Sequence, residues 1–253
     1  MLKFLTKAII FLGIVLGAIT FVYIYDLYQE IKDDIDSVVN YNPKQSTQFF
    51  DKNGKLLANT FKDENREYVN YDDIPARVIE GLVAIEDTQF FEHFGVNPDA
   101  ISRAVIKNIQ SGGYSEGAST LTQQLIKVLL LSREKKIIRK VKEALLAIRL
   151  ETVLTKEEIL ERYLNHVYFG HGYYGVKTAA KGYFKKNLYE LTLKEIAILV
   201  GLPRAPSFYD PTKNLQVSLA RANQVITRMH TLGWINNEQF EESINETPTI
   251  YNQ

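Results

Sequence analysis

The sequence predicts a mainly α-helical domain preceded by one membrane-spanning helix and a short β-hairpin. Three observations support this prediction. A continuous apolar run occupies residues 8–25, an Asn-Gly pair at residues 53–54 separates two short apolar stretches, and apolar residues recur at helical spacing from residue 74 onward. Strands and helices do not alternate along the chain, so a nucleotide-binding domain built on a parallel sheet is not expected.

The composition is that of a folded globular chain. Of the 253 residues, 45% are apolar and 24% are charged, which excludes a disordered, collagen-like or coiled-coil protein. Thirty basic residues balance thirty acidic ones, and this zero net charge argues against a general nucleic-acid binder. There is no cysteine, so disulfide bonds and thiolate metal sites are excluded.

Residues 8–25 are predicted to cross a membrane as an uncleaved signal anchor. As a helix rising about 1.5 Å per residue, the run would span roughly 27 Å, close to the ~30 Å hydrocarbon core of a bilayer. Lys3 and Lys7 precede the run and mainly acidic residues follow it, so we expect the N-terminus in the cytoplasm and the remainder outside. A cleaved signal peptide is disfavoured, because cleavage after Ala18 would leave Leu16 where a small residue is required.

The later elements are predicted from caps and turns. Residues 26–45 are polar and predict a stalk, and Asn53-Gly54 predicts a hairpin over residues 47–60. The expected helices cover residues 74–86, 98–110, 121–131, 133–154 and 215–232, with two more opened by capping boxes at Thr155…Glu158 and Thr192…Glu195. The predicted division is a cytoplasmic tail (1–7), the anchor (8–25), a stalk with hairpin (26–73), the main domain (74–245) and a C-terminal tail or linker (246–253).

Glu86 is the first candidate catalytic residue. It ends an apolar helical stripe and is followed by Phe90 and Phe91. A carboxylate among aromatic side chains loses solvation, which raises its pKa and suits a general base or acid. The alternative interpretation is an ordinary surface carboxylate at the end of a helix.

A basic stripe indicates the charge of the ligand. Eight basic residues lie between Lys127 and Arg149, opposed by Glu134 and Glu143 alone. Ion pairs within one helix account for part of the pattern, because Arg139 and Lys140 precede Glu143 by four and three residues. The remaining excess favours phosphate groups, which arginine forks and lysine charges match, or the headgroups of anionic lipids.

Residues 117–127 form a third candidate segment. Hydroxyl and amide side chains follow a glycine at a predicted helix start, where they could bind an anion or a sugar or could simply cap the helix. His166 and His171 are not accompanied by a carboxylate in a zinc-binding pattern, so a zinc site is not expected.

Five segments, taken in order, resemble the motifs of the family 51 peptidoglycan glycosyltransferases. These enzymes are the polymerising domains of class A penicillin-binding proteins and the monofunctional cell-wall transglycosylases. The matching segments are Glu86–Gly95 (EDTQFFEHFG), Gly117–Gln124 (GASTLTQQ), Arg139–Glu143 (RKVKE), Lys156–Asn165 (KEEILERYLN) and Arg204–Pro211 (RAPSFYDP). The resemblance implies a lysozyme-like, two-lobed helical fold with a cleft, on the outer side of the bacterial cytoplasmic membrane.

The resemblance also implies substrates and residue roles. The donor would be a glycan chain on undecaprenyl pyrophosphate and the acceptor lipid II, with Glu86 as general base and Glu143 as the second essential carboxylate. Whether Glu143 orients cations or coordinates a divalent ion such as Mg²⁺ or Mn²⁺ stays open. The implied pyrophosphate-binding residues are Lys127, Arg133, Arg139, Lys140 and Lys142, and the implied cleft residues are His93, Ser119, Thr120, Gln123, Gln124, Asn165 and Arg204.

Two other functions remain as alternatives. A lysozyme-like hydrolase or lytic transglycosylase would need two carboxylates and no basic stripe, so the stripe favours transfer from a lipid pyrophosphate. A membrane scaffold that binds anionic lipid would need no catalytic carboxylate. The resemblance further implies that moenomycin-type inhibitors and other cell-wall synthesis proteins bind the domain, and that the chain is the N-terminal part of a bifunctional penicillin-binding protein.

Overall fold

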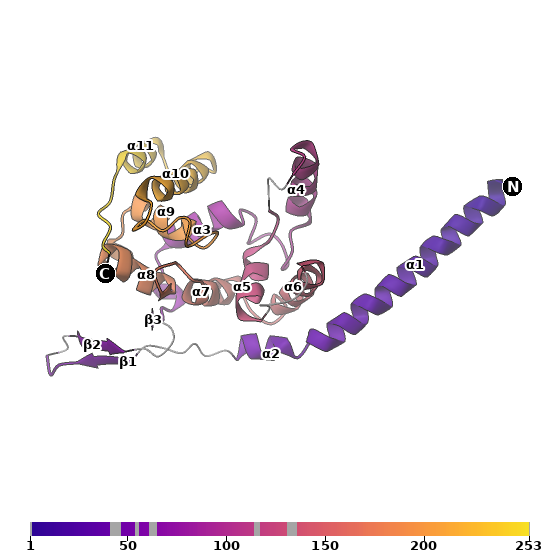
Figure 1. Ribbon diagram of the computed structural model, residues 1–253, viewed down its shortest axis with the longest axis horizontal. Coiled ribbons are helices and arrows are strands. Elements are labelled where there is room, and N and C mark those ends of the chain that lie inside the picture. Colours follow the sequence, from indigo (N-terminus) through magenta and orange to yellow (C-terminus); the bar gives the residue numbers. More distant parts are fainter. Residues whose placement is uncertain are drawn as a thin grey trace.

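The computed structural model describes residues 2–40, 47–53, 56–60, 65–113, 117–130 and 136–252. Helices dominate this part of the chain, so the predicted mainly α class is confirmed (Figure 1). The helices are α1 (Leu2–Ile31), α2 (Asp34–Val39), α3 (Ala76–Glu86), α4 (Pro98–Gln110), α5 (Leu121–Leu129), α6 (Lys136–Leu150), α7 (Lys156–His166), α8 (Val176–Phe184), α9 (Leu193–Gly201), α10 (Leu215–Thr231) and α11 (Asn237–Asn245).

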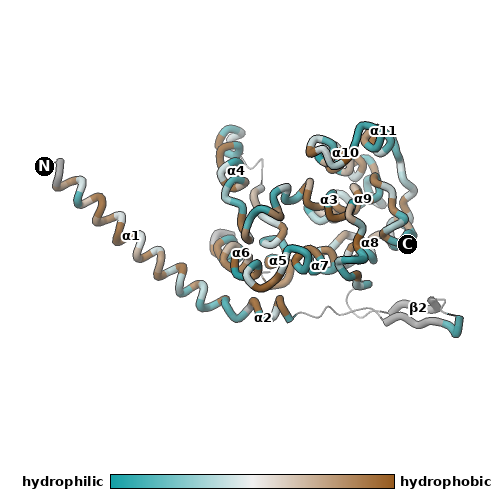
Figure 2. Tube along the Cα trace, turned by 180° about the vertical axis from the view of Figure 1, so that it is seen from behind, coloured by the Kyte–Doolittle hydropathy of each residue, from teal (hydrophilic) through white to brown (hydrophobic). Residues whose placement is uncertain are grey.

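Helix α1 projects from the domain and is long and apolar enough to cross a membrane over Phe4–Ile31. Hydrophobic residues occupy much of its length (Figure 2). The helix continues to Ile31, beyond the predicted end of the anchor at Tyr25. Its membrane role stays a prediction, since length and composition alone support it.

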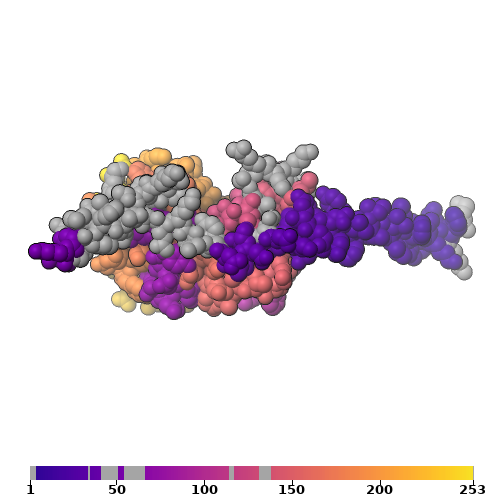
Figure 3. Space-filling model, turned by 90° about the horizontal axis from the view of Figure 1, so that it is seen from below, coloured from indigo at the N-terminus to yellow at the C-terminus, as the bar shows by residue number. Residues whose placement is uncertain are grey.

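The segment after the anchor differs from the predicted polar stalk. Leu27, Ile31, Ile35 and Val38 are buried, because their spacing of three or four residues places them on one face of α1 and α2. This face packs near α6, and the Arg162 guanidinium donates to the carbonyl oxygen of Val39 at 2.9 Å. In the space-filling view α2 lies against the body of the domain while most of α1 extends away from it (Figure 3).

The hairpin prediction is confirmed in its two strands. β1 (Thr47–Phe50) and β2 (Leu56–Thr60) pair antiparallel with Thr47 opposite Thr60, and the predicted turn residue Gly54 lies outside the described residues. A second pairing was not predicted. The two-residue strands β3 (Asn65–Arg66) and β4 (Tyr173–Tyr174) pair in parallel and join segments far apart in the sequence.

The predicted caps are present. Asn97 accepts a hydrogen bond from the backbone N–H of Ala100 ahead of Pro98, and both predicted capping boxes form. Helices α8 and α11 were not predicted from the sequence. Gly175 precedes α8 with a φ of +84° and no side-chain cap, whereas Asn236 opens α11 through a capping box that the sequence does contain.

The packing groups the helices into two sets. Helices α3, α9 and α10 pack against one another, and α5 packs against α6 and α7. Figure 1 shows α4 and α6 on the side of the domain nearer to α1, with α9, α10 and α11 on the other side. The functional residues of motifs one and two lie where these sets meet, because Glu86 ends α3 and Thr120 caps α5.

The packing of α2 can be tested by a core truncation. Replacing Ile35 with alanine should lower the free energy of unfolding by about 2–5 kcal/mol, because buried methyl groups are lost and a cavity remains. Lys32→Ala, at an exposed position beside α2, is the matched control and should change it by less than about 0.5 kcal/mol. Chemical unfolding of the full chain in detergent measures both, and equal small effects would mean that residues 26–39 form a free stalk.

Candidate active site

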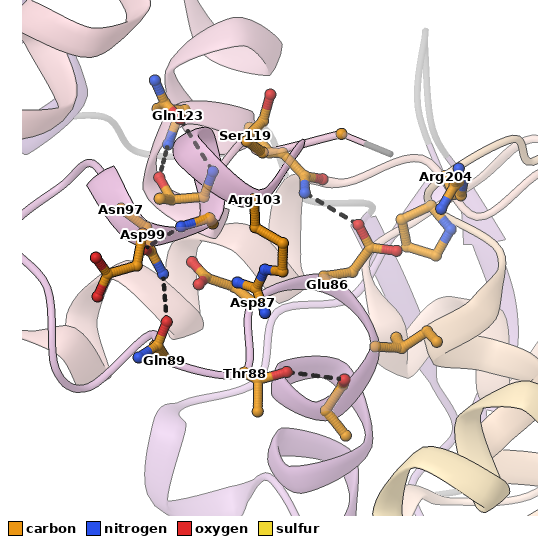
Figure 4. Close-up of a pocket in the computed structure, with 18 of the residues that line it drawn as sticks. Glu86, Asp87, Thr88, Gln89, Asn97, Asp99, Arg103, Ser119, Gln123 and Arg204 are labelled. Carbon is orange, nitrogen blue, oxygen red and sulfur yellow. Dashed lines mark hydrogen bonds between the residues drawn. The ribbon is translucent and has the colours of Figure 1, made fainter. Parts of the chain in front are cut away.

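A cleft with a volume of about 1070 Å³ lies where the two sets of helices meet. Its lining combines carboxylates, amides, hydroxyls and cations, mainly from α3, α4, α5, α6, α10 and the loop after α9. Figure 4 shows Glu86, Asp87, Arg103, Ser119 and Arg204 around this cleft. The predicted site residues that line it are Glu86, Ser119, Thr120, Gln123, Gln124, Lys127, Lys140, Glu143 and Arg204.

Glu86 is held at the last residue of α3 with its side chain only 10% exposed. Burial raises the pKa of its carboxyl group. Two hydrogen bonds act in the opposite direction: Gln124 Nε2 donates to Oε2 at 3.0 Å, and an Arg221 nitrogen donates to Oε1 at 3.1 Å. Glu86 is therefore a poorly solvated carboxylate that keeps specific donors for its charged form, so the surface-carboxylate interpretation is wrong.

Asp87 and His93 connect the segment Glu86–Gly95 to the start of α5. Asp87 also lines the cleft, whereas His93 does not. Asp87 Oδ2 accepts from the backbone N–H of Leu121 at 3.0 Å and lies 2.9 Å from His93 Nε2. Thr120 adds a second link, because its hydroxyl donates to the Gly95 carbonyl oxygen at 2.6 Å. His93 is buried and does not line the cleft, contrary to expectation.

Glu143 is fully buried and surrounded by positive charge. Its side chain is 0% exposed, Lys140 donates to Oε2, and the Nε of Arg139 lies 3.1 Å from Oε1. The same Lys140 ammonium donates to the Ser119 hydroxyl at 2.8 Å. Cations already face both Glu143 oxygens, which leaves neither oxygen open to a divalent ion. A divalent ion therefore does not fit here.

The predicted pyrophosphate-binding residues separate into three groups. Lys127 and Lys140 line the cleft, whereas Arg133 lies outside the described residues. Arg139 contacts Glu143 but does not line the cleft. Lys142 is buried on another face of α6, where its ammonium lies 3.1 Å from Glu30 of α1. Residues two positions apart in an α-helix are rotated by about 200° around its axis, so Lys140 and Lys142 lie on different faces of α6.

Asn165 is a structural residue in this arrangement. It is fully buried, accepts from the backbone N–H of Val69 at 2.9 Å and donates to the Val69 carbonyl oxygen at 2.8 Å. These bonds attach the chain before α3 to α7. Asn165 therefore does not reach the cleft, although the resemblance implied that it would.

Several residues of the site were not predicted from the sequence. Arg103 and Lys107 of α4 and Arg228 of α10 add positive charge to the cleft lining. Arg221 donates a hydrogen bond to Glu86, and the Tyr163 hydroxyl donates to Oε1 of the cleft residue Gln124 at 3.0 Å. Arg103 and Lys107 follow Asn97-Pro98 on one predicted helix, so this second basic cluster could have been found in the sequence. The contact between Arg221 and Glu86 could not, because no local spacing links them.

Comparisons with known proteins point to one family. A family model described as Transglycosylase matches residues 53–230. The chain is 42% identical over 241 residues to penicillin-binding protein 1A of Aquifex aeolicus (strain VF5), an alignment covering 94% of this chain and 33% of the relative. It is 41% identical over 226 residues to penicillin-binding protein 1A of Escherichia coli (strain K12), covering 88% and 26%.

A solved structure shows the same fold. The crystal structure of penicillin-binding protein 1A from Haemophilus influenzae matches with a TM-score of 0.50 and 27% identity, over 84% of this chain and 22% of that one. The chain thus spans a third or less of the length of these relatives. Together with the five motifs in order, these matches show that the chain belongs to the transglycosylase family and carries a family 51 peptidoglycan glycosyltransferase domain.

Proposed function

We propose that this domain polymerises lipid II into β-1,4-linked glycan strands, with the growing chain on undecaprenyl pyrophosphate as donor. The observation that carries the proposal is that a buried carboxylate, Glu86, shares one cleft with Lys127, Lys140 and Arg204. A transfer from a sugar pyrophosphate needs both features. One group must accept a proton from the attacking hydroxyl, and fixed positive charge must meet the departing diphosphate.

Glu86 acts as the general base in this mechanism. It takes the proton from the 4-hydroxyl of the acceptor N-acetylglucosamine while that oxygen attacks C1 of the donor N-acetylmuramic acid. The bond from C1 to the pyrophosphate oxygen breaks with its electron pair, so the α-linkage is inverted to β. The products are the extended chain, undecaprenyl pyrophosphate and a proton held on Glu86.

The cations stabilise the leaving group. A unit charge about 4 Å from a phosphate oxygen contributes roughly 4 kcal/mol at an effective dielectric constant near 20, before its own desolvation cost. Lys140 is suited to this role because Ser119 and Glu143 fix its ammonium in the cleft wall. Glu143 then serves as the counter-charge that assembles Arg139 and Lys140, which is the first of the two roles that the sequence left open.

A lysozyme-like hydrolase is less compatible with the same cleft. That reaction uses two carboxylates flanking the glycosidic bond, one of them able to act as nucleophile or to activate water. Glu86 and Glu143 both line the cleft, but Glu143 is buried and neutralised by Arg139 and Lys140. The hydrolase predicts sugar release from finished peptidoglycan, whereas the transferase predicts polymer from purified lipid II.

The setting of the reaction is also a proposal. We infer that α1 anchors the chain in the bacterial cytoplasmic membrane with its N-terminus inside, so that the cleft receives lipid-linked substrates from the outer leaflet. The relatives named penicillin-binding protein 1A support placing this domain in a longer class A protein. Binding of moenomycin-type inhibitors and of other cell-wall synthesis proteins stays an expectation.

Removing the base should abolish polymerisation. Glu86→Gln is expected to lower kcat on purified lipid II by about 10²- to 10⁴-fold, because the amide cannot accept the proton. Glu80→Gln makes the same change on the same helix outside the cleft and should retain activity. Electrophoresis of the glycan products measures both variants, and normal polymer lengths and rates in Glu86→Gln would end the assignment.

Two lysines of α6 should differ in their effects. Lys140→Met is expected to lower kcat/KM by about 10- to 100-fold, the size of one lost charge-assisted hydrogen bond. Lys142→Met should leave kcat/KM close to that of the parent chain and lower the unfolding temperature instead, because Lys142 pairs with Glu30 of α1. An equal loss of kcat/KM in both variants, with unchanged unfolding temperatures, would place Lys142 on the substrate.

A further inference from the structure

We propose that Arg221 is a positioning residue that holds Glu86 ionised and aimed into the cleft, and that Gly201 is a glycine in order to leave space for the arginine. The inference rests on the proposed function, in which Glu86 is the base. It concerns contacts among three helices, since Glu86 ends α3, Gly201 ends α9 and Arg221 lies within α10.

The ion pair between Arg221 and Glu86 is buried on both sides. The side chains are 5% and 10% exposed, and the donated nitrogen lies 3.1 Å from Oε1. The other terminal nitrogen of Arg221 donates to Gln224 Oε1 at 3.1 Å, and the guanidinium carbon lies 5.6 Å from the centre of the Tyr209 ring. The guanidinium is therefore fixed from three directions before substrate arrives, as a preorganised charge must be.

Gly201 controls the path of the arginine stem. A Cβ atom added at Gly201 would lie 2.9 Å from Cγ of Arg221, closer than carbon atoms approach in folded proteins. Gly201 belongs to the last turn of α9, and its φ is not positive, so the backbone does not require glycine there. The requirement is steric. Because the far end of Arg221 is held by Glu86, Gln224 and Tyr209, the stem cannot move aside without disturbing the ion pair.

The second oxygen of Glu86 is fixed from the opposite side. Gln124 donates its amide N–H to Oε2, and the Tyr163 hydroxyl donates to the amide oxygen of Gln124, so the amide presents its nitrogen to Glu86. The carboxylate plane is thus set by one donor from α10 and one from α5. Of these two donors the one from α10 carries charge, so it lowers the carboxyl pKa both as a hydrogen-bond donor and as a nearby positive charge.

The direction of the pH effect follows from the groups around Glu86. Burial raises its carboxyl pKa, while Gln124, Arg221 and Arg204 lower it. The other charged residues that line the cleft are the cations Arg103, Lys107, Lys127, Lys140 and Arg228 and the carboxylates Asp87, Asp99 and Glu143. A base must be ionised to act, so the rate falls as the pH drops through the pKa of Glu86. Removing Arg221 takes away one of the groups that lower the pKa of Glu86, so the pKa rises and the rate falls off at a higher pH.

The test compares pH–rate profiles of the full chain with lipid II. In Arg221→Met the acid limb of kcat/KM should move upward by about one pH unit or more, which is a loss of about tenfold or more below the pKa and recovery above it. Arg221→Lys keeps a charge and should move the limb less. Gly201→Ala should move it in the same direction as Arg221→Met, although it alters neither member of the ion pair.

Gly81→Ala is the matched glycine control. Its added Cβ would lie 3.3 Å from Val200 of α9, so it strains the packing of α3 against α9. Arg221 is not among the groups that this Cβ meets, so the acid limb should not shift. A uniform drop at all pH values in Arg221→Met and Gly201→Ala, or an equal shift in Gly81→Ala, would overturn the inference. The proposed function fails separately, if Glu86→Gln still polymerises lipid II.

Discussion

The desolvation of Glu86 is the constraint on which the site depends. A carboxylate that must take a proton from a sugar hydroxyl gains basicity from burial, yet burial also favours the neutral form, which cannot act as a base. Hydrogen-bond donors from two helices favour the charged form: Gln124 of α5 and Arg221 of α10 both donate to the carboxylate. Helices α3, α5 and α10 must therefore hold a fixed relation to one another, and the packing of α3 with α9 and α10 supplies much of that relation.

The second carboxylate shows the opposite arrangement for the opposite purpose. Glu143 is buried between Arg139 and Lys140, so in the proposed function its charge orients these cations and takes no part in proton transfer. A lysine that is already oriented needs little reorganisation when negative charge develops on a leaving group, which is the condition for electrostatic catalysis. The proposed roles of the two glutamates differ because their nearest neighbours differ: Glu86 contacts one arginine and a neutral amide, whereas Glu143 contacts two cations.

The sequence predicts the elements of this site better than their relations. Caps, capping boxes and the hairpin are local signals, and the structure contains them at Asn97, Thr155 and Thr192. The motif resemblance identified Glu86, Lys140 and Glu143, which meet in one cleft. The motifs do not distinguish residues that line the cleft from residues that hold the surrounding helices together. His93, Asn165 and Lys142 were therefore expected at the substrate, but they are buried and do not line the cleft. The partner of Glu86 escaped prediction because Arg221 lies 135 residues away and no local spacing links the two.

Lys142 shows why such a misassignment carries information. Within a basic motif, each lysine fits a phosphate equally well by charge, and only the face of the helix decides its partner. Lys140 faces the cleft, while Lys142 reaches Glu30 of α1, next to the buried Leu27 and Ile31. Helix α6 therefore presents the Lys140 ammonium to the cleft on one face and contacts the C-terminal end of α1 on another. In the proposed function the lipid tail of the substrate lies in the bilayer, and this contact between α1 and α6 holds the Lys140 ammonium at a set distance from the anchor.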